Sequence, residues 1–109
     1  TYAALETLLA SRGCGVLYLA AFDPDLGYAQ ARSFFCEVGR SVAEDPATGS
    51  AAGPLCAYLH ERTGADRVIV DQGVMMGRPS RLEAQVDVDR IRVAGDVVIL
   101  AEGEVRLPV

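Results

Sequence analysis

Apolar and polar residues alternate most regularly between positions 82 and 89. Every second position there is apolar and the positions between carry charged or amide side chains: Leu82, Ala84, Val86 and Val88 against Glu83, Gln85, Asp87 and Asp89. Successive side chains of a β-strand point to opposite faces of a sheet. The pattern therefore predicts a strand over 82–89 with one buried face and one face in water.

Other segments are also extended in pattern. The run VLYLAAF over 16–22 is continuously apolar, and DPDLG after it is typical of a turn. The segment YAQARSFFCEV over 28–38 then resumes an extended pattern. A hairpin or two neighbouring strands are therefore predicted. After Asp89 the apolar residues change from even to odd positions, at Ile91 and Val93. AGD then interrupts the pattern, and the apolar run VVILA follows over 97–101. EGE separates this run from Val105 and Leu107. We expect several short strands separated by turns.

Two segments have helical spacing. Tyr2, Leu5, Leu8 and Leu9 share one face of a helix that Gly13 can end. Between Ala51 and Leu59 almost every residue is apolar or small, which predicts a helix enclosed by other elements, with Gly64 as its C-terminal cap. Pro54 leaves the start open, because the first turn is irregular or the helix begins at Pro54 itself. The pattern as a whole indicates an antiparallel α+β fold.

Composition narrows the class of protein. A chain of 109 residues, half of them hydrophobic, is large enough for one core, so residues 1–109 are predicted to form a single domain. The net charge of -5 and the absence of Lys argue against nucleic-acid binding. No apolar run is long enough to cross a membrane. Three cysteines without a CxxC pair favour a reduced, cytoplasmic setting, and no residue cluster has metal-ligand spacing. The first residue is not Met, which suggests a fragment or a processed chain.

The segment EDPATGSAAGPLCAYLHERTG, over 44–64, carries the candidate chemistry. Asp45 precedes the small turn of Thr48, Gly49 and Ser50, which leads into the second predicted helix. The free N–H groups and the positive end of the helix dipole suit a carboxylate or phosphate at that point. The structural alternative is that Thr48 and Ser50 merely cap the helix.

Four further residues have a functional and a structural interpretation. Glu44 is a candidate base, although a second negative charge at Asp45 would oppose it, and its ordinary role is to favour the helix dipole. His60 follows Cys56 by four residues, as in an activated thiol, but a core cysteine and a histidine near a helix C-terminus explain the spacing better. Arg78, in the turn GRPS, is either a ligand contact or a solvated loop residue.

Three motif blocks, EDPATGSAAGPLCAYL, DQGVMMGRPSRLEAQV and IRVAGDVVILAEGEVRLP, resemble the C-terminal half of the phenazine-biosynthesis PhzF-like isomerases. The resemblance covers roughly residues 31–108. It implies a fold like that of diaminopimelate epimerase, in which each of two similar halves wraps a strongly curved, barrel-like and mostly antiparallel sheet around a central helix. The active site would lie in the cleft between the halves.

The resemblance also implies an activity and roles for residues. The reaction is proton transfer without a cofactor at a carbon next to a carboxylate, as in isomerising a dihydro-hydroxyanthranilate. Asp45 would be the catalytic residue of this half and form a hydrogen bond with a polar group of the substrate. Gly49 and Ser50 would hold the substrate carboxylate, and Thr48 would shape the turn. Related epimerases carry a catalytic Cys in the equivalent turn, so Asp45 points to the isomerase branch.

The resemblance leaves this chain with one half of a site. The principal acid/base Glu of the family belongs to the N-terminal half, which this sequence lacks. We therefore expect an N-terminal half-domain or a second chain as partner. The alternative is a non-catalytic homodimeric binding or interaction module in which two copies bury the apolar face.

Overall fold

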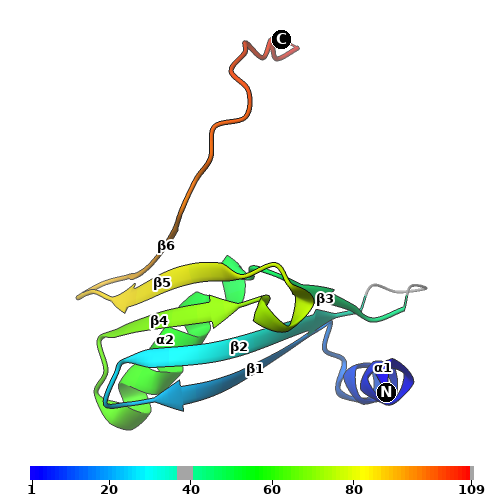
Figure 1. The fold of residues 1–109 in the computed structure, drawn as a ribbon, viewed down its shortest axis with the longest axis vertical. Coiled ribbons are helices and arrows are strands. Elements are labelled where there is room, and N and C mark those ends of the chain that lie inside the picture. Colours follow the sequence, from blue (N-terminus) through cyan, green and yellow to red (C-terminus); the bar gives the residue numbers. More distant parts are fainter. Residues whose placement is uncertain (37–40, 109) are drawn as a thin grey trace.

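The structure is a computed structural model that describes residues 1–36 and 41–108. Figure 1 shows its elements, which follow one another in this order: α1 Tyr2–Arg12, β1 Val16–Asp23, β2 Tyr28–Phe35, β3 Ala43–Asp45, α2 Gly49–Thr63, β4 Arg67–Gln72, the 3₁₀ turn η1 Val74–Met76, β5 Ser80–Val86 and β6 Ile91–Gly95. The predicted hairpin is confirmed as β1 and β2. Positions 37 and 38 of its predicted second strand lie outside the described residues.

In the described part of the chain, six strands form one mixed sheet in the order β1-β2-β4-β5-β6, with β3 paired to β2. The β2–β4 pair is parallel and the other strand pairs are antiparallel. The connection between β2 and β4 passes through β3 and α2, as parallel neighbours require a long crossover. The α+β class and the mostly antiparallel pairing are thus confirmed.

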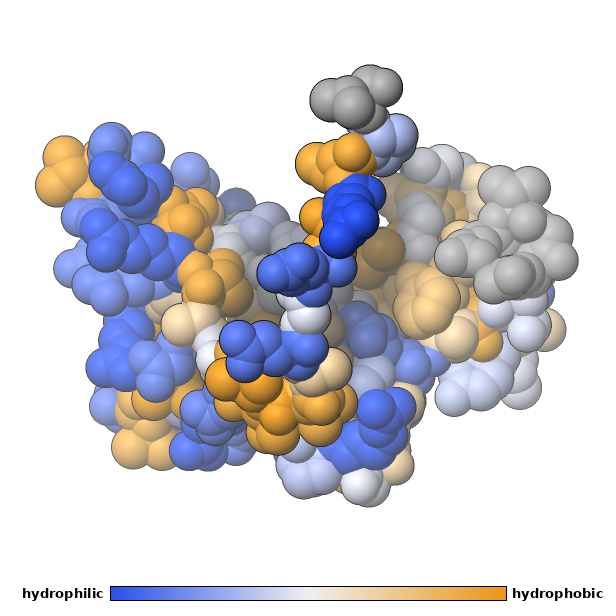
Figure 2. Space-filling model, turned by 90° about the horizontal axis from the view of Figure 1, so that it is seen from above, coloured by the Kyte–Doolittle hydropathy of each residue, from blue (hydrophilic) through white to orange (hydrophobic). Residues whose placement is uncertain are grey.

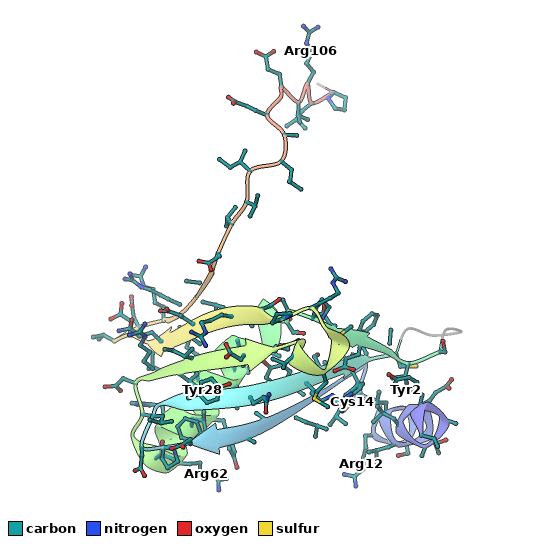
Figure 3. All side chains as sticks on the ribbon, viewed as in Figure 1. Tyr2, Arg12, Cys14, Tyr28, Arg62 and Arg106 are labelled. Carbon is teal, nitrogen blue, oxygen red and sulfur yellow. The ribbon has the colours of Figure 1, made fainter. Side chains whose placement is uncertain are left out.

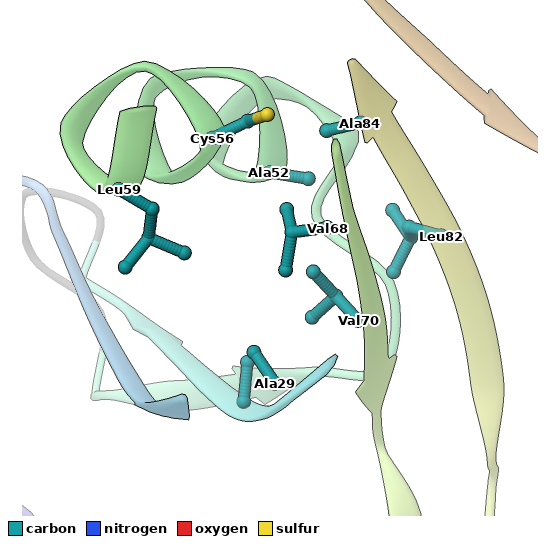
Figure 4. Packing of buried hydrophobic residues seen from close by; sticks show 9 residues of the cluster. Ala29, Ala52, Cys56, Leu59, Val68, Val70, Leu82 and Ala84 are labelled. Carbon is teal, nitrogen blue, oxygen red and sulfur yellow. The ribbon is translucent and has the colours of Figure 1, made fainter. Parts of the chain in front are cut away.

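The main core lies between α2 and the sheet. Figure 4 shows side chains of α2 facing those of the strands. The buried cluster is Ala29, Ala31, Ala52, Cys56, Leu59, Val68, Val70, Leu82 and Ala84. Small residues let the helix lie close to the sheet: a Cβ added at Gly53 would meet Val93 at 3.4 Å. A second, smaller cluster of Leu9, Phe34 and Val42 anchors α1.

The sheet is open, with β1 at one edge and β6 at the other. The prediction of a helix enclosed by strands holds for one side of α2 only, because the strands beside it do not close around its outer face. Tyr58 on that face is 53% exposed. The barrel-like closure expected from the family is therefore not seen in the described part of the chain.

The helix ends follow the sequence. Gly13 and Gly64 both adopt left-handed backbone conformations, with φ of 63° and 75°, as predicted for C-terminal caps. The open question about Pro54 is resolved: α2 begins at Gly49 and continues through Pro54. A proline at this position removes the hydrogen bond to the carbonyl of Ser50. Ser50 is exposed in the first turn, so water can satisfy that carbonyl.

The C-terminal part of the chain departs from the prediction. The alternating strand is confirmed as β5, with Leu82 and Ala84 buried, but it ends at Val86, and Val88 is fully exposed. Segments 97–101 and 105–107, expected as strands, form no regular structure in the described chain. A strand is stabilised by cross-strand pairs, and these segments pair with no described strand. Among the described residues, no helix has the length and apolarity that crossing a membrane requires.

Candidate functional site

Asp45 and Thr48 meet at the point where β3 leads into α2. The Thr48 hydroxyl donates to a carboxylate oxygen of Asp45, with Oγ1 and Oδ2 2.7 Å apart. Asp45 is the last residue of β3 and pairs with Ser33 of β2, so the sheet fixes its backbone. The Thr48 hydroxyl makes no capping bond to the helix, contrary to the capping interpretation. It holds the Asp45 carboxylate in place instead.

Gln72, the last residue of β4, lies beneath this turn and is fully buried. Its amide nitrogen donates to the Asp45 backbone carbonyl at 2.7 Å and to Thr48 Oγ1 at 2.9 Å. Its amide oxygen accepts from the Tyr18 hydroxyl at 3.0 Å and from the Thr48 N–H at 3.3 Å. A buried amide is retained at low cost only when it is fully bonded, and Gln72 meets that condition. It therefore ties β1, β3 and the start of α2 together.

The beginning of α2 presents two N–H groups without a protein acceptor. The carbonyl of Thr48 accepts from Ala51 at 3.1 Å and from Ala52 at 3.2 Å. Within the described residues, the N–H groups of Gly49 and Ser50 donate to no protein atom, as is usual in a first helical turn. With the positive end of the helix dipole, they form a site that can accept an anionic oxygen.

Gly49 is not required by the fold. A Cβ added there would meet only Val93, at 3.9 Å, which is ordinary van der Waals contact, and its φ is not positive. The packing of the protein thus leaves space above the Gly49 backbone. That space lets an anion approach the N–H groups closely.

Gly73 lies between two segments of the site: the loop that contains Arg78 and the turn that follows Asp45. It has φ of 75°, and an added Cβ would clash with the Arg78 carbonyl oxygen and lie 2.9 Å from that of Pro46. The Arg78 N–H donates back to the Gly73 carbonyl at 3.0 Å. The backbone of Arg78 is therefore brought close to the Asp45–Ser50 turn, while its role as a ligand contact stays a prediction.

Tyr18 lies at the edge of the site and is half-buried. Burial, and to a lesser extent the negative charge of Asp45, raise the pKa of Tyr18 to about 12. The phenol is therefore neutral at physiological pH and acts as a hydrogen-bond donor to Gln72. Neutral Tyr18 can support the site without adding a charge to it.

Glu44 is already engaged in another interaction. Both of its carboxylate oxygens accept from the Arg32 guanidinium, each at 2.9 Å. The hydrogen bond to Arg32 lowers the pKa of Glu44 below its ordinary value. A carboxylate fixed in this way is a weak base, so Glu44 is not the replacement acid/base of the site.

Cys56 and His60 do not form a catalytic pair. His60 Nδ1 lies 3.0 Å from a carboxylate oxygen of Asp66, and Cys56 Sγ donates to the backbone carbonyl of Asp66 at 3.8 Å. Burial raises the pKa of the Cys56 thiol, which opposes its activation. The structural interpretation of both residues is therefore supported.

Gln72 is not among the site residues predicted from the sequence. Val68, Val70 and Gln72 share the buried face of β4, so the period of two would have placed an amide in the core. What it holds is set by contacts more than twenty residues away in sequence, which periodicity does not reveal. Among the residues that the structure describes, no group of three or more His, Cys, Asp or Glu side chains is placed to hold a metal ion.

Comparisons with known proteins complete the description of the site. Residues 5–103 match the family model described as phenazine biosynthesis-like protein. The chain is similar to trans-2,3-dihydro-3-hydroxyanthranilate isomerase of Pseudomonas aeruginosa, with 40% identity over 74 residues that cover 61% of this chain and 27% of the relative. It is also similar to an uncharacterised isomerase of Clostridium acetobutylicum, with 31% identity over 114 residues that cover 94% of this chain and 37% of the relative.

A third relative is the uncharacterised isomerase YddE of Escherichia coli, 30% identical over 93% of this chain and 37% of the relative. The chain thus spans between a quarter and two fifths of the length of these relatives. Because the family model covers nearly the whole sequence, the chain belongs to the phenazine biosynthesis-like protein family of PhzF-like isomerases.

Proposed function

We propose that this chain is the substrate-binding, C-terminal half of a PhzF-like isomerase that moves a proton at a carbon next to a carboxylate without a cofactor. The observation that carries the proposal is the pair of N–H groups at Gly49 and Ser50, which meet no acceptor among the described residues and follow an Asp45 carboxylate held by Thr48. The P. aeruginosa relative, which is named for such an isomerisation, lends the reaction class.

Each of these residues would contact a different group of the substrate. The N–H groups of Gly49 and Ser50 would donate hydrogen bonds to the substrate carboxylate. Asp45 would accept a hydrogen bond from a hydroxyl or amino group of the substrate and so orient it. Negative charge that develops next to the carboxylate during proton transfer is stabilised by the same N–H groups. Arg78, on the loop held by Gly73, is the nearby cation we assign to the ligand.

A second half must complete the reaction. Glu44 is bonded to Arg32 and is not available as the acid/base, so we assign that group to an N-terminal half-domain or a second chain. Closing the cleft between two halves would also exclude water and strengthen the hydrogen bonds to the substrate. A reduced, cytoplasmic setting fits this chemistry.

Binding can be tested on the chain as it is. We expect 3-hydroxyanthranilate to shift the NMR amide signals of Gly49 and Ser50 in the ¹⁵N-labelled chain, and 2-aminophenol, which lacks the carboxylate, to leave them in place. Gly49→Ala should weaken binding by about tenfold or more, because the methyl group fills the space that the anion needs. It should change the free energy of unfolding by less than about 0.5 kcal/mol, because no protein atom is displaced.

Gly103→Ala is the matched control, since an added Cβ there meets nothing within 4 Å and at Gly49 it makes only an ordinary van der Waals contact. Equal shifts with both compounds, or unchanged affinity in Gly49→Ala, would contradict the carboxylate site. The reaction is tested by the uptake of solvent deuterium into trans-2,3-dihydro-3-hydroxyanthranilate. We expect uptake when the chain is joined to the N-terminal portion of the P. aeruginosa relative, and its loss in Asp45→Asn of the joined protein. A folded joined protein without uptake counts against the isomerase.

A further inference from the structure

The side-chain amide of Gln72 has a single favourable orientation. The Asp45 backbone carbonyl, which can only accept, lies 2.7 Å from Nε2. The Thr48 backbone N–H, which can only donate, lies 3.3 Å from Oε1. Exchanging the two ends of the amide would bring two acceptors together at one end and two donors at the other. Gln72 is fully buried, so water would not satisfy those groups, and the backbone holds the amide in this orientation.

The fixed amide sets the direction of the hydrogen bonds on both sides of it. Gln72 Nε2 also donates to Thr48 Oγ1 at 2.9 Å, so the hydrogen of that hydroxyl is left for Asp45 Oδ2, 2.7 Å away. On the other side, Gln72 Oε1 accepts from the Tyr18 hydroxyl at 3.0 Å. The pKa of Tyr18 is raised to about 12, chiefly by burial, so this hydroxyl keeps the hydrogen that it donates. Every donor in the series Tyr18, Gln72, Thr48 and Asp45, here called the directed network, therefore points toward Asp45.

The directed network uses one carboxylate oxygen of Asp45 and leaves the other. Oδ2 accepts from Thr48, whereas Oδ1 meets no donor among the residues that the structure describes. The Asp45 side chain is partly exposed, so a ligand can reach Oδ1. An ionised carboxylate accepts hydrogen bonds and donates none. Oδ1 can therefore bind only a ligand group that carries a hydrogen, such as a hydroxyl or an amine.

The charge of Asp45 is not paired with a cation in the described part of the chain. Arg32, on the neighbouring strand β2, is bonded to Glu44 through both carboxylate oxygens. Residues 96–108 also take no part: Figure 3 shows their side chains, Arg106 among them, away from the helices and the sheet, and Figure 2 shows the same segment in front of the rest of the molecule. A hydrogen bond from a ligand to such a carboxylate is stronger than one between neutral groups.

Gln72 also holds the donors of the candidate site. Its Oε1 accepts from the N–H of Thr48, which directly precedes Gly49 at the beginning of α2. One buried side chain thereby fixes both the acceptor at Asp45 and the helix turn that carries the free N–H groups. A site built to bond a donor group of its ligand rejects the analogue that lacks it, because its own polar group is then left unpaired.

We propose that Tyr18, Gln72 and Thr48 are positioning residues that hold Asp45 as a hydrogen-bond acceptor for the ligand, so that the site distinguishes carboxylates with a donor group from carboxylates without one. The inference rests on the proposed function, since it takes the N–H groups of Gly49 and Ser50 as the carboxylate site. Tyr18 acts on the ligand only through the directed network, with two residues between its hydroxyl and Asp45.

The test compares two ligands that share a carboxylate. 3-Hydroxyanthranilate also carries amino and hydroxyl donors, and benzoate carries none. We expect NMR titration of the ¹⁵N-labelled chain to show binding of 3-hydroxyanthranilate about tenfold or more tighter than that of benzoate, as one hydrogen bond to a charged group contributes. Thr48→Val, which has nearly the same shape but no hydroxyl, should reduce this ratio to less than about threefold. Thr48→Ser, which keeps the hydroxyl, should restore it.

A second variant tests the distant end of the directed network. Tyr18→Phe removes only the hydroxyl that Gln72 accepts from, and it should lower the ratio in the same direction as Thr48→Val. Tyr58→Phe is the matched control, because Tyr58 is 53% exposed on the outer face of α2 and lies outside the network. It should leave the ratio unchanged. Circular dichroism establishes that each variant is folded at the temperature of the titration.

Hydrogen exchange tests the network without a ligand. The side-chain amide hydrogens of Gln72 should exchange slowly, and faster in Thr48→Val and in Tyr18→Phe, whereas those of the exposed Gln85 should exchange fast in every variant. Exchange at Gln72 as fast as at Gln85 would overturn the inference. So would a ratio that survives Thr48→Val, and in that case benzoate binding would leave the carboxylate site standing. If neither compound shifts the signals of Gly49 and Ser50, the proposed function fails and the inference fails with it.

Discussion

Gln72→Leu tests whether the buried amide supports the candidate site. Leucine has a similar size but forms no hydrogen bond, so the change leaves the Tyr18 hydroxyl, the Asp45 carbonyl and the Thr48 N–H without their partner. Each buried polar group left unsatisfied costs about 1–3 kcal/mol. Because these groups are partly buried and water can reach some of them, we take the lower end, about 3 kcal/mol in total. In a domain of this size, that lowers Tm by more than about 10 °C.

The assay is urea and thermal unfolding followed by circular dichroism. Gln85→Leu is the matched control, because Gln85 is exposed on β5 and the chemical change is the same. It should shift the free energy of unfolding by no more than about 0.5 kcal/mol. In Gln72→Leu, the NMR amide signals of Gly49 and Ser50 should also move, because the turn before them loses its anchor. If Gln72→Leu and Gln85→Leu destabilise equally, the hydrogen-bond network is not a support of the site and the reasoning is refuted.

Two further changes probe the surroundings of the site. Gly73→Ala should destabilise the fold by more than about 2 kcal/mol, because a Cβ at φ of 75° meets the Arg78 carbonyl. Gly77→Ala is the control and should cost about 1 kcal/mol, because its φ is 69° but an added Cβ meets nothing within 4 Å. Equal losses of stability in urea unfolding would contradict the packing argument. Glu44→Gln should lower the free energy of unfolding near pH 7, and the difference from wild type should shrink as the pH falls below the ordinary pKa of a glutamate. The Arg32 contact lowers the pKa of folded Glu44, so its stabilisation is present above the unfolded pKa and is lost as pH falls through the folded one. If the difference in free energy of unfolding between Glu44→Gln and wild type does not depend on pH, the role assigned to the Arg32 contact is refuted.

The local elements follow from the sequence because their causes are local. Alternation placed β5, a turn separated β1 from β2, and glycines able to adopt positive φ ended both helices. The position of Asp45, Thr48 and Gly49 at a helix start was also readable, since each lies within a few residues of the others. Roles for these residues came from the family resemblance and remain proposals until the binding experiment is done.

Where the prediction departed from the structure, the deciding contact was distant in sequence or missing from the described chain. Periodicity predicted strands at 97–101 and 105–107, but an apolar run becomes a strand only beside an edge that accepts it. The helix was expected to start late or irregularly because of Pro54. It starts at Gly49 because packing of Ala52, Gly53 and Cys56 against the sheet outweighs one lost hydrogen bond.

By itself, the sequence determined the α+β class, the spans of most elements and the turn that begins α2, because side-chain periodicity and backbone preference act over a few residues. Tertiary structure decided how that turn is held. Gln72 is 24 residues from Thr48 and 54 from Tyr18, and only the pairing of β4 with β2 and of β2 with β1 brings the three together. It also left Glu44 bonded to Arg32 and the edge of β1 open. Such contacts depend on which elements become neighbours in space, which local preference does not specify.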